Sequence, residues 1–361
     1  MLRLNNTGQH PRKRRDTTIR GLEDETMATP DQGRSVGRQV LPANSMSAVR
    51  LRNNDVLQQA QALPFWSQDY TQLSPGSFQG EVDSIATRGI QLFRESMTCS
   101  VDELANAPAN AYVIGIAGKV TGDSHWGSVA LAENALITLD KNAELIFRTS
   151  HQSEISVAVI NTERLDDYAE QVLGVDLRCV FGKIRPVERL DQARADSMRR
   201  MFNDFFLHLP PIARITPNHA AWNHFEDEIM TECVQALASV KPLTQRATDI
   251  RIHRYLVNRV RERTLASPLC PPSIGELCRE LNVSRRTLNH AFMRVLGITP
   301  IAYIRNIRLN RVRADLQTCK LSGNSIADIA IHWGFWHMSL FSRYYKGLFG
   351  ELPSETRSRH A

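Results

Sequence analysis

The chain has 361 residues, of which 42% are hydrophobic, so it is long enough to fold as two domains with cores of their own. No run approaches the about 18 consecutive apolar residues of a membrane-spanning helix, and the basic N-terminus lacks the apolar segment of a signal peptide. These features exclude a single small domain and argue against a membrane partner. We therefore expect a cytoplasmic protein.

The positive charge is concentrated at one end of the chain. The formal net charge is +6, but residues 251–361 carry 18 basic and 7 acidic residues (+11), whereas residues 51–250 carry 17 and 26 (−9). A region with such an excess of Lys and Arg is typical of a polyanion binder, because each neutralised phosphate releases counterions. An ordinary solvated basic surface remains the alternative.

The six cysteines form neither a metal-binding nor a disulfide pattern. None belongs to a Cys-x-x-Cys pair or has histidines at zinc-ligand spacing, so we expect reduced thiols, no metal site and no cofactor. The cysteines are Cys99, Cys179, Cys233, Cys270, Cys278 and Cys319.

Residues 1–50 are rich in Arg, Asn, Gln, Ser and Thr and have almost no periodic apolar pattern. This composition predicts a disordered basic tail. The basic run at 12–15 leaves a DNA-touching arm as the alternative to an inert tail, and Met27 and Met46 leave a later translation start open.

Residues 51–243 combine β-strand patterns with later helical ones. Regularly spaced β-rich runs predict an antiparallel barrel or sandwich, and apolar residues three and four apart then predict helices. The expected fold class is α+β, with a β-barrel before an all-α C-terminal region. The expected strands are 77–82, 112–117, 129–131, 135–139, 145–148 and 155–160, and the expected helices are 163–172, 190–206 and 222–237.

The interior of such a barrel can enclose one ligand or be filled by side chains, and the sequence leaves both open. The histidines of this region do not form the His-x-His plus Glu cluster of a metal-bearing barrel. No nucleophile or acid/base constellation stands out either, so we expect no catalytic residues. An enzyme built on the barrel remains a rival hypothesis.

Residues 244–361 have helical patterns throughout. The first helix places Ile252, Tyr255, Leu256 and Val260 on one face, with arginines on the others. Proline residues then end it, and the sequence Ser-Ile-Gly-Glu at 273–276 is a capping box that starts the next helix. The arginines expected on the other faces are Arg251, Arg254, Arg259, Arg261 and Arg263.

A helix-turn-helix unit is predicted at about 273–296. Asn282 suits a left-handed helix C-terminus, Val283 suits a tight apolar corner, and Ser284 can cap the following helix. That helix buries apolar residues three and four apart and leaves side chains suited to reading base edges outside. The buried set is Leu288, Ala291, Phe292 and Val295, and the outer set is Arg285, Arg286, Asn289, His290 and Arg294.

A second unit at about 325–349 repeats this design. Residues 325–328 (Ser-Ile-Ala-Asp) cap one helix, and Gly334 and Phe335 form the turn into the next. Between the units, Thr299 and Pro300 start a long helix that can hold both in one orientation. The second recognition helix buries Leu340, Phe341, Tyr344 or Tyr345, and Leu348, and its outer face offers His337, Met338, Ser339, Ser342 and Arg343.

The region from about 250 to 361 resembles the DNA-binding domain of the AraC/XylS transcription regulators. The resemblance is carried by Ser284-xxx-Leu288-xxx-Phe292, by Gly-Ile-Thr-Pro at 297–300, and by a string from Ile326 to Pro353 containing Gly334-Phe335 and Phe349-Gly350. Cys278, Val312 and the pair Trp336-His337 depart from the family pattern and leave the start of the second recognition helix open. The segments 75–81 and 333–337 are similar to the ethanolamine-type subgroup.

The resemblance implies a transcription regulator, expected to act as an activator. Arg286, Asn289 and His290 would read one major groove, and Ser339, Ser342 and Arg343 the next, while Arg294 and Lys346 would touch phosphates. Residues 51–243 would form a cupin-like domain for effector binding or dimerisation. Implied partners are promoter double-stranded DNA, RNA polymerase, a second copy of the chain and a small-molecule effector of unknown identity and site. A nonspecific nucleic-acid-binding protein remains the other rival.

Overall fold

The computed structural model describes residues 46–118, 124–139, 143–207, 212–215, 219–240, 251–318 and 323–360. Most of the expected N-terminal tail lies outside these residues. Its last part does not match the expectation of disorder, because strand β1 (Met46–Asn53) begins within it.

Among the described residues, the larger of two sheets is an eight-stranded antiparallel sheet in the order β12-β9-β6-β11-β4-β3-β1-β13. Its central strand β6 is buried throughout, which explains its continuous apolar sequence Ala-Tyr-Val-Ile-Gly-Ile-Ala. β1 pairs with β13 at one edge and with β3 on its other side. The strands besides β1 are β3 (Gly80–Ala86), β4 (Ile90–Met97), β6 (Ala111–Ala117), β9 (Ala135–Leu139), β11 (Ser153–Asn161), β12 (Val187–Arg189) and β13 (Ile212–Ile215).

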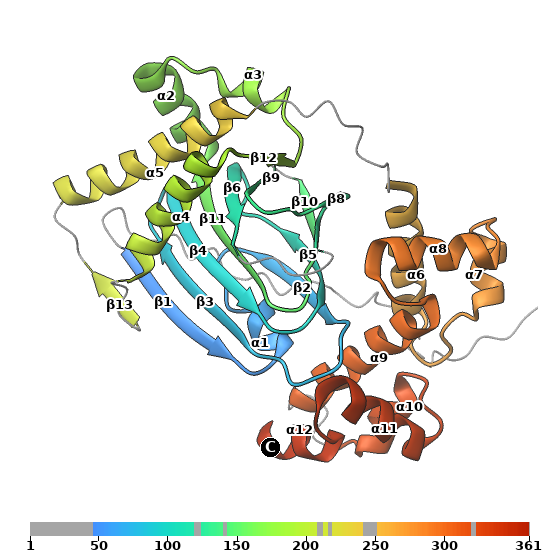
Figure 1. Cartoon of the computed structure of the whole chain (residues 1–361). Helices are drawn as coiled ribbons and strands as arrows, with labels where there is room; N and C mark the ends of the chain where they lie inside the picture. The colour runs from blue at the N-terminus through green and yellow to red at the C-terminus, as the bar shows by residue number, and fades with distance from the viewer. Residues whose placement is uncertain are drawn as a thin grey trace, which may run out of the picture. The chain divides into compact units, whose positions relative to one another are not determined.

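The second sheet has five strands in the order β2-β5-β10-β7-β8. Its Trp126 and Phe147 share a core with Phe93 and Val157 of the larger sheet, so the two sheets pack face to face (Figure 1). No described strand pair joins them into a closed barrel, so the barrel expected from the sequence is present as two facing antiparallel sheets. The strands are β2 (Ser67–Gln72), β5 (Val101–Asn106), β7 (His125–Trp126), β8 (Val129–Ala130) and β10 (Glu144–Arg148); α1 (Val56–Ala60) precedes β2.

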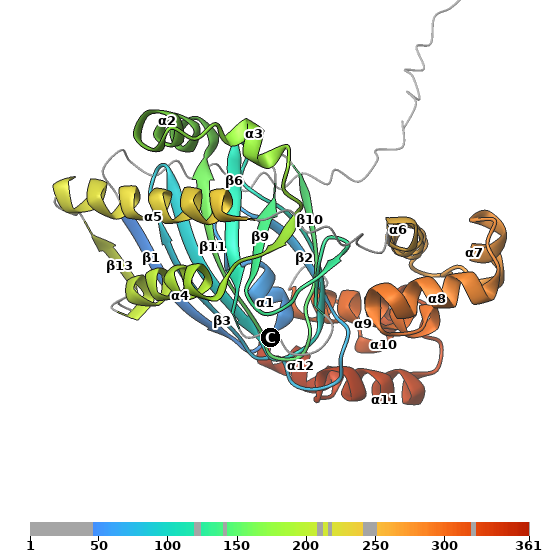
Figure 2. The ribbon, with the colours of Figure 1, turned by 45° about the horizontal axis from the view of Figure 1, so that its top comes forward.

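Four helices cover the outer face of the larger sheet (Figures 1 and 2). The core between them contains Ile114 and Ile116 from β6 together with Met198, Phe202 and Ile229 from the helices. The helical segments expected from the sequence are confirmed here. The helices are α2 (Thr162–Leu173), α3 (Leu177–Phe181), α4 (Gln192–Leu207) and α5 (His219–Ser239). We call residues 46–239 the β region.

The remaining chain is helical, and we call residues 251–360 the helical region. Two hydrophobic clusters form within it, one around α8 and one around α11. None of the helices in the described ranges is long and apolar enough to cross a membrane. The helices are α6 (Arg251–Ala266), α7 (Ile274–Glu280), α8 (Arg285–Leu296), α9 (Pro300–Gln317), α10 (Ile326–His332), α11 (Met338–Phe349) and α12 (Pro353–His360).

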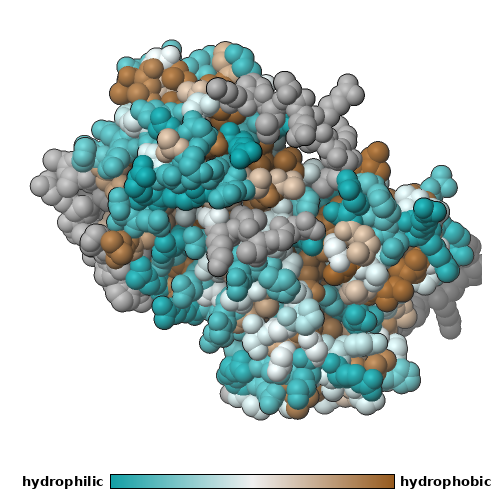
Figure 3. All heavy atoms as spheres, viewed as in Figure 1, coloured by the Kyte–Doolittle hydropathy of each residue, from teal (hydrophilic) through white to brown (hydrophobic). Residues whose placement is uncertain are grey.

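Hydrophobic side chains are scattered over an otherwise largely hydrophilic surface on the face drawn in Figure 3. Single exposed apolar residues are normal on soluble proteins. The cysteines that fall within the described ranges are free thiols, whereas Cys319 lies outside those ranges. No group of three or more His, Cys, Asp or Glu that could hold a metal was found among the described residues.

Candidate DNA-binding interface

The first helix-turn-helix unit has the local structure expected from its sequence. Ser273 and Glu276 form the capping box of α7, each accepting a hydrogen bond from the other's backbone N–H. Asn282 adopts a left-handed conformation with φ of 51°, as the corner requires. The hydroxyl of Ser284 then accepts from the backbone N–H of Thr287, 3.0 Å away, and so caps α8. Both helix starts and the turn are therefore fixed by local hydrogen bonds.

Helix α8 separates an apolar inner face from a polar outer face. Leu288, Ala291 and Phe292 are completely buried and Val295 nearly so. All five residues expected on the outer face are exposed, and the described chain offers its three arginines no ion-pair partner, so they remain available to an anion. The five are Arg285, Arg286, Asn289, His290 and Arg294.

One of these outer residues is held in place from the neighbouring helix. The His290 ring contacts the ring of His253 on α6 edge to face, with centroids 5.2 Å apart. Burial lowers the pKa of His253, and the nearby His290 and Arg294 lower it further. His253 is therefore neutral at physiological pH and supports the His290 ring from α6.

The second unit follows the same plan with a different helix start. Ser325 and Asp328 form a capping box on α10, and Gly334 makes the turn with φ of 72°. Helix α11 begins at Met338, with His337 in the capping position but without a side-chain hydrogen bond to the helix. This settles the start that the departure from the family pattern had left open.

The outer face of α11 is smaller than the sequence predicts. Ser339, Arg343 and Lys346 are exposed, but Met338 and Ser342 are only half-exposed. Met338 packs against the core of the second unit. The expected inner residues Phe341, Tyr345 and Leu348 are buried, whereas Leu340 and Tyr344 are half-buried.

Helix α9 connects the two units by contributing to both hydrophobic cores. Tyr303 and Ile307 belong to the cluster around α8, and Leu309 and Val312 belong to the cluster around α11. Thr299 caps the helix through the backbone N–H of the third helical residue, 3.3 Å from its hydroxyl. Because α9 is one continuous helix that contributes to both cores, it fixes the spacing of α8 and α11.

The expected faces of α6 are wrong at four positions. Ile252 and Tyr255, expected inside, are 71% and 59% exposed. Arg254 and Arg261, expected outside, are 5% and 4% exposed. The helix therefore buries two arginines against the β region, although apolar periodicity alone predicts that both are exposed to solvent.

Ion pairs with the β region explain the burial of these arginines. Arg254 Nη2 lies 2.9 Å from Asp102 Oδ1 on β5, and Arg261 Nη2 lies 2.7 Å from Asp69 Oδ2 on β2. The hydroxyl of Tyr303 on α9 donates to Asp102 Oδ2 at 2.7 Å. Burial raises the pKa of Asp69, but Arg261 and Arg311 outweigh this and hold it below its usual value. Asp69 is therefore ionised at neutral pH.

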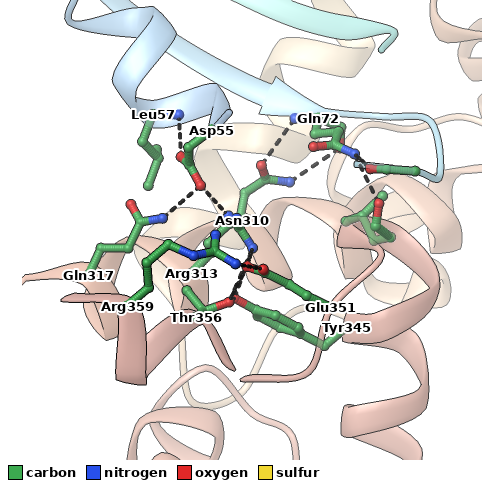
Figure 4. A network of polar contacts seen from close by, with 12 residues as sticks. Asp55, Leu57, Gln72, Asn310, Arg313, Gln317, Tyr345, Glu351, Thr356 and Arg359 are labelled. Carbon is green, nitrogen blue, oxygen red and sulfur yellow. Dashed lines mark hydrogen bonds and ion pairs between the residues drawn. The ribbon is translucent and has the colours of Figure 1, made fainter. Parts of the chain in front are cut away.

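Arg313 of α9 is the centre of a further buried network (Figure 4). Its Nε donates to Asp55 Oδ2 at 2.6 Å, and its Nη1 lies 2.9 Å from Glu351 Oε1. Asp55 also caps α1 through the backbone N–H of Leu57 and accepts from Gln317 Nε2 at 2.7 Å. One arginine thus links the first helix of the β region to the linking helix and to the turn before α12.

Neutral hydrogen bonds complete this contact. Asn310 Oδ1 accepts from the backbone N–H of Gln72, and Asn310 Nδ2 donates to the carbonyl of Gln72, at 3.0 and 3.2 Å (Figure 4). Gln72 Nε2 also donates to the carbonyl of Leu348 near the end of α11. Apolar periodicity gave no indication that any of these residues forms a docking contact, although the opposite charges of 51–250 and 251–361 were a signal for such contacts.

Comparison with known proteins agrees with this geometry. Residues 277–359 match the family described as "Helix-turn-helix domain". The XylDLEGF operon transcriptional activator 2 of Pseudomonas putida is 40% identical over 88 residues, which are 24% of this chain and 56% of that protein. A solved AraC-type transcriptional regulator from Chromobacterium violaceum is 30% identical, with 30% of this chain and 94% of that one covered and a TM-score of 0.28. Through this region, the chain belongs to the AraC/XylS family.

The family model covers only residues 277–359, in the C-terminal part of the chain. The probable thc operon regulatory protein of Rhodococcus erythropolis is 35% identical over 85 residues, which are 24% of this chain and 26% of that protein. The chain thus spans about half the length of the first relative and about a quarter of the second. These AraC/XylS proteins are named as regulators of operons and not as enzymes.

Proposed function

We propose that this AraC/XylS protein binds promoter DNA sequence-specifically through α8 and α11 and activates transcription. The observation that carries the proposal is the pair of helices α8 and α11 with exposed polar residues, both packed on one linking helix. A nonspecific DNA binder needs positive charge but no second positioned reading helix.

In this proposal, α8 and α11 each contact one part of the DNA site. On α8, Arg286 pairs with guanine, and Asn289 and His290 read neighbouring base edges. Arg285 and Arg294, at either end of the same helix, bind the flanking phosphates. These assignments rest on the exposure of all five side chains.

On α11, Arg343 is the principal base-reading residue, because it is charged and exposed. Ser339 and the half-exposed Ser342 contribute shorter hydrogen bonds, and Met338 contributes an apolar contact beside the helix start. Lys346 binds phosphate as a point charge. The second half-site lies about one helical turn of DNA from the first.

The β region, which corresponds to the domain expected at residues 51–243, is proposed as a cupin-like domain that binds a small-molecule effector and supports self-association. The ion pairs with α6 and α9 would couple such a domain to the helical region, within residues 244–361, because a shift of β2 or β5 would reach that region through them. Activation through RNA polymerase is proposed because relatives are named as transcriptional activators.

The test is selection of bound sequences from a random DNA pool by the full chain and by two variants. We expect a bipartite motif with half-sites about one helical turn apart. Arg286→Ala should remove the base preference at one half-site of the motif, and Arg343→Ala should remove it at the other. Enrichment without any motif would support the nonspecific binder and refute this proposal.

A further inference from the structure

Two glutamates lie buried together between the sheets of the β region. Glu95 on β4 and Glu103 on β5 are each 2% exposed. The Tyr70 hydroxyl on β2 lies 3.1 Å from Glu95 Oε1, and Gln68 Nε2 lies 2.8 Å from that hydroxyl and 3.2 Å from Glu103 Oε1. Gln59 Nε2 on α1 donates to Glu95 Oε1 at 2.8 Å. Two carboxyl groups thus share one neutral hydrogen-bond network.

No positive charge compensates this pair among the described residues that bond to it or shift its pKa. The groups that bond to it are Gln59 from α1 and Gln68 and Tyr70 from β2, and the one further charge that shifts its pKa, Asp102 on the opposite face of β5, is also negative. Burial raises the pKa of Glu95 to about 7. Burial, and then the charge of Glu95, raise that of Glu103 well above its usual value.

The hydrogen-bond pattern around Glu103 independently accommodates a proton. Glu103 Oε2 and Gln68 Oε1 are both buried acceptors without a hydrogen-bond donor. Two unsatisfied buried acceptors are costly, whereas a protonated carboxyl on Glu103 supplies the missing donor. The geometry therefore fits a pair in which one carboxyl group carries a proton and the two are linked through Tyr70 and Gln68.

The same two strands carry the carboxylates that dock the helical region. Successive side chains of a strand point to opposite faces. On β5, Glu103 faces the buried pair while the adjacent Asp102 binds Arg254 and Tyr303. On β2, Tyr70 faces the pair while the adjacent Asp69 binds the arginines of α6 and α9. A shift of either strand therefore moves both features together.

We infer that Glu95 and Glu103 form a proton-binding site whose occupancy is coupled to docking of the helical region on β2 and β5. With the proton bound, the network holds β2 and β5 against β4. When the last proton dissociates to solvent, two adjacent carboxylates repel each other in the core. Separation of β5 from β4 relieves the repulsion, and it displaces Asp69 and Asp102, on the opposite face of these strands, from the positions in which they bind their arginines.

Hydrogen–deuterium exchange of the full chain tests the coupling, without DNA and independently of any DNA-binding role. Exchange is followed between about pH 6 and pH 9, a range above the ordinary glutamate pKa, and corrected for intrinsic rates. In the wild type, amides of β2, β5, α6 and α9 should lose at least tenfold protection as pH rises. In Glu103→Gln and Glu95→Gln, protection should stay constant.

Glu188→Gln is the matched control, because Glu188 is also 2% exposed but lies on β12 and accepts from the backbone N–H of Arg185. It should show the wild-type profile. Identical pH profiles in the wild type and both pair variants would overturn the proposal. So would loss of protection confined to β2 and β5, because the proposal requires α6 and α9 to respond with them.

Two further measurements keep the proposal testable if the Gln variants fold poorly. The wild type should show the infrared carbonyl stretch of a protonated buried carboxyl at neutral pH, and absence of that band would overturn the proposal. Tyr70→Phe removes a hydrogen bond to Glu95 and should move the loss of protection to higher pH, since the ionised form loses a donor. An unshifted transition would also count against it.

Discussion

Replacing Arg313 by Met should strongly destabilise the protein, because it leaves the buried carboxylate of Asp55 without its cation, whereas Glu351 keeps its pair with Arg359. The side chains of Arg313 and Asp55 are 5% and 4% exposed, and that of Glu351 is 15% exposed. Breaking a buried ion pair by removing one partner costs about 3–5 kcal/mol, since the remaining charge stays buried. Arg313 also stacks over the ring of Phe349, 4.6 Å from its centroid, so its removal also loses that packing.

A double-mutant cycle with Asp55→Asn separates the ion pair from these other effects. The asparagine side chain keeps an oxygen that can accept from the Leu57 backbone N–H, so the cap of α1 survives while the charge is lost. Free energies of unfolding are measured by urea denaturation for the wild type, both single variants and the double variant. We expect the double variant to cost about 1–3 kcal/mol less than the sum of the singles.

The exposed pair Arg52–Glu81 supplies the control for this cycle. Its side chains are 79% and 57% exposed, although its N–O distance of 2.9 Å is as short as that between Arg313 and Glu351. Arg52→Met should therefore cost less than about 1 kcal/mol. Additivity of the Arg313 and Asp55 variants within about 0.5 kcal/mol would refute the reasoning, because it would mean that the β region and α9 do not interact through this pair.

Three further predictions concern stability. Because burial raises the pKa of Glu95 in the folded protein to about 7, this group stabilises the fold fully below its ordinary pKa, and that stabilisation is lost as pH rises through about 7. The free energy of unfolding should therefore fall as pH rises from the ordinary pKa to about 7, and Glu95→Gln should flatten this dependence on pH. Ser284→Ala should cost about 0.5–2 kcal/mol in urea denaturation, and no loss would mean that the cap of α8 is dispensable. Gly334→Ala should cost more than Gly174→Ala, although both have left-handed φ and each alanine is strained by about 1–2 kcal/mol, because only at 334 would the Cβ meet backbone, 2.8 Å from the carbonyl oxygen of Leu269; equal melting temperatures would contradict this.

Much of the fold follows directly from sequence periodicity. The strands β6 and β9 are predicted almost to the residue, because their residues are apolar on both faces and lie between turn residues. The inner and outer faces of α8 are also correct, because Leu288 and Phe292 are four positions apart on a helix that is capped locally. In these cases local propensity and tertiary burial agree.

The strands β2 and β5 could not be predicted in this way. Their sequences, Ser-Gln-Asp-Tyr-Thr-Gln and Val-Asp-Glu-Leu-Ala-Asn, are polar or acidic, which normally indicates loops or exposed helices. They are strands because one face contributes to the buried glutamate network and the other binds arginines of the helical region. The same long-range pairing explains the error at α6, where Arg254 and Arg261 are buried by partners more than 150 positions away in sequence.

The most direct test of the central claim compares two variants on DNA that carries the selected motif and on random DNA. Arg286→Ala should cost about 1–3 kcal/mol of binding free energy on the motif and far less on random DNA, because a base contact is lost. Lys346→Ala should weaken both about equally, because a phosphate contact carries no sequence information. If Arg286→Ala instead lowers both affinities equally, α8 does not read sequence and the account is contradicted.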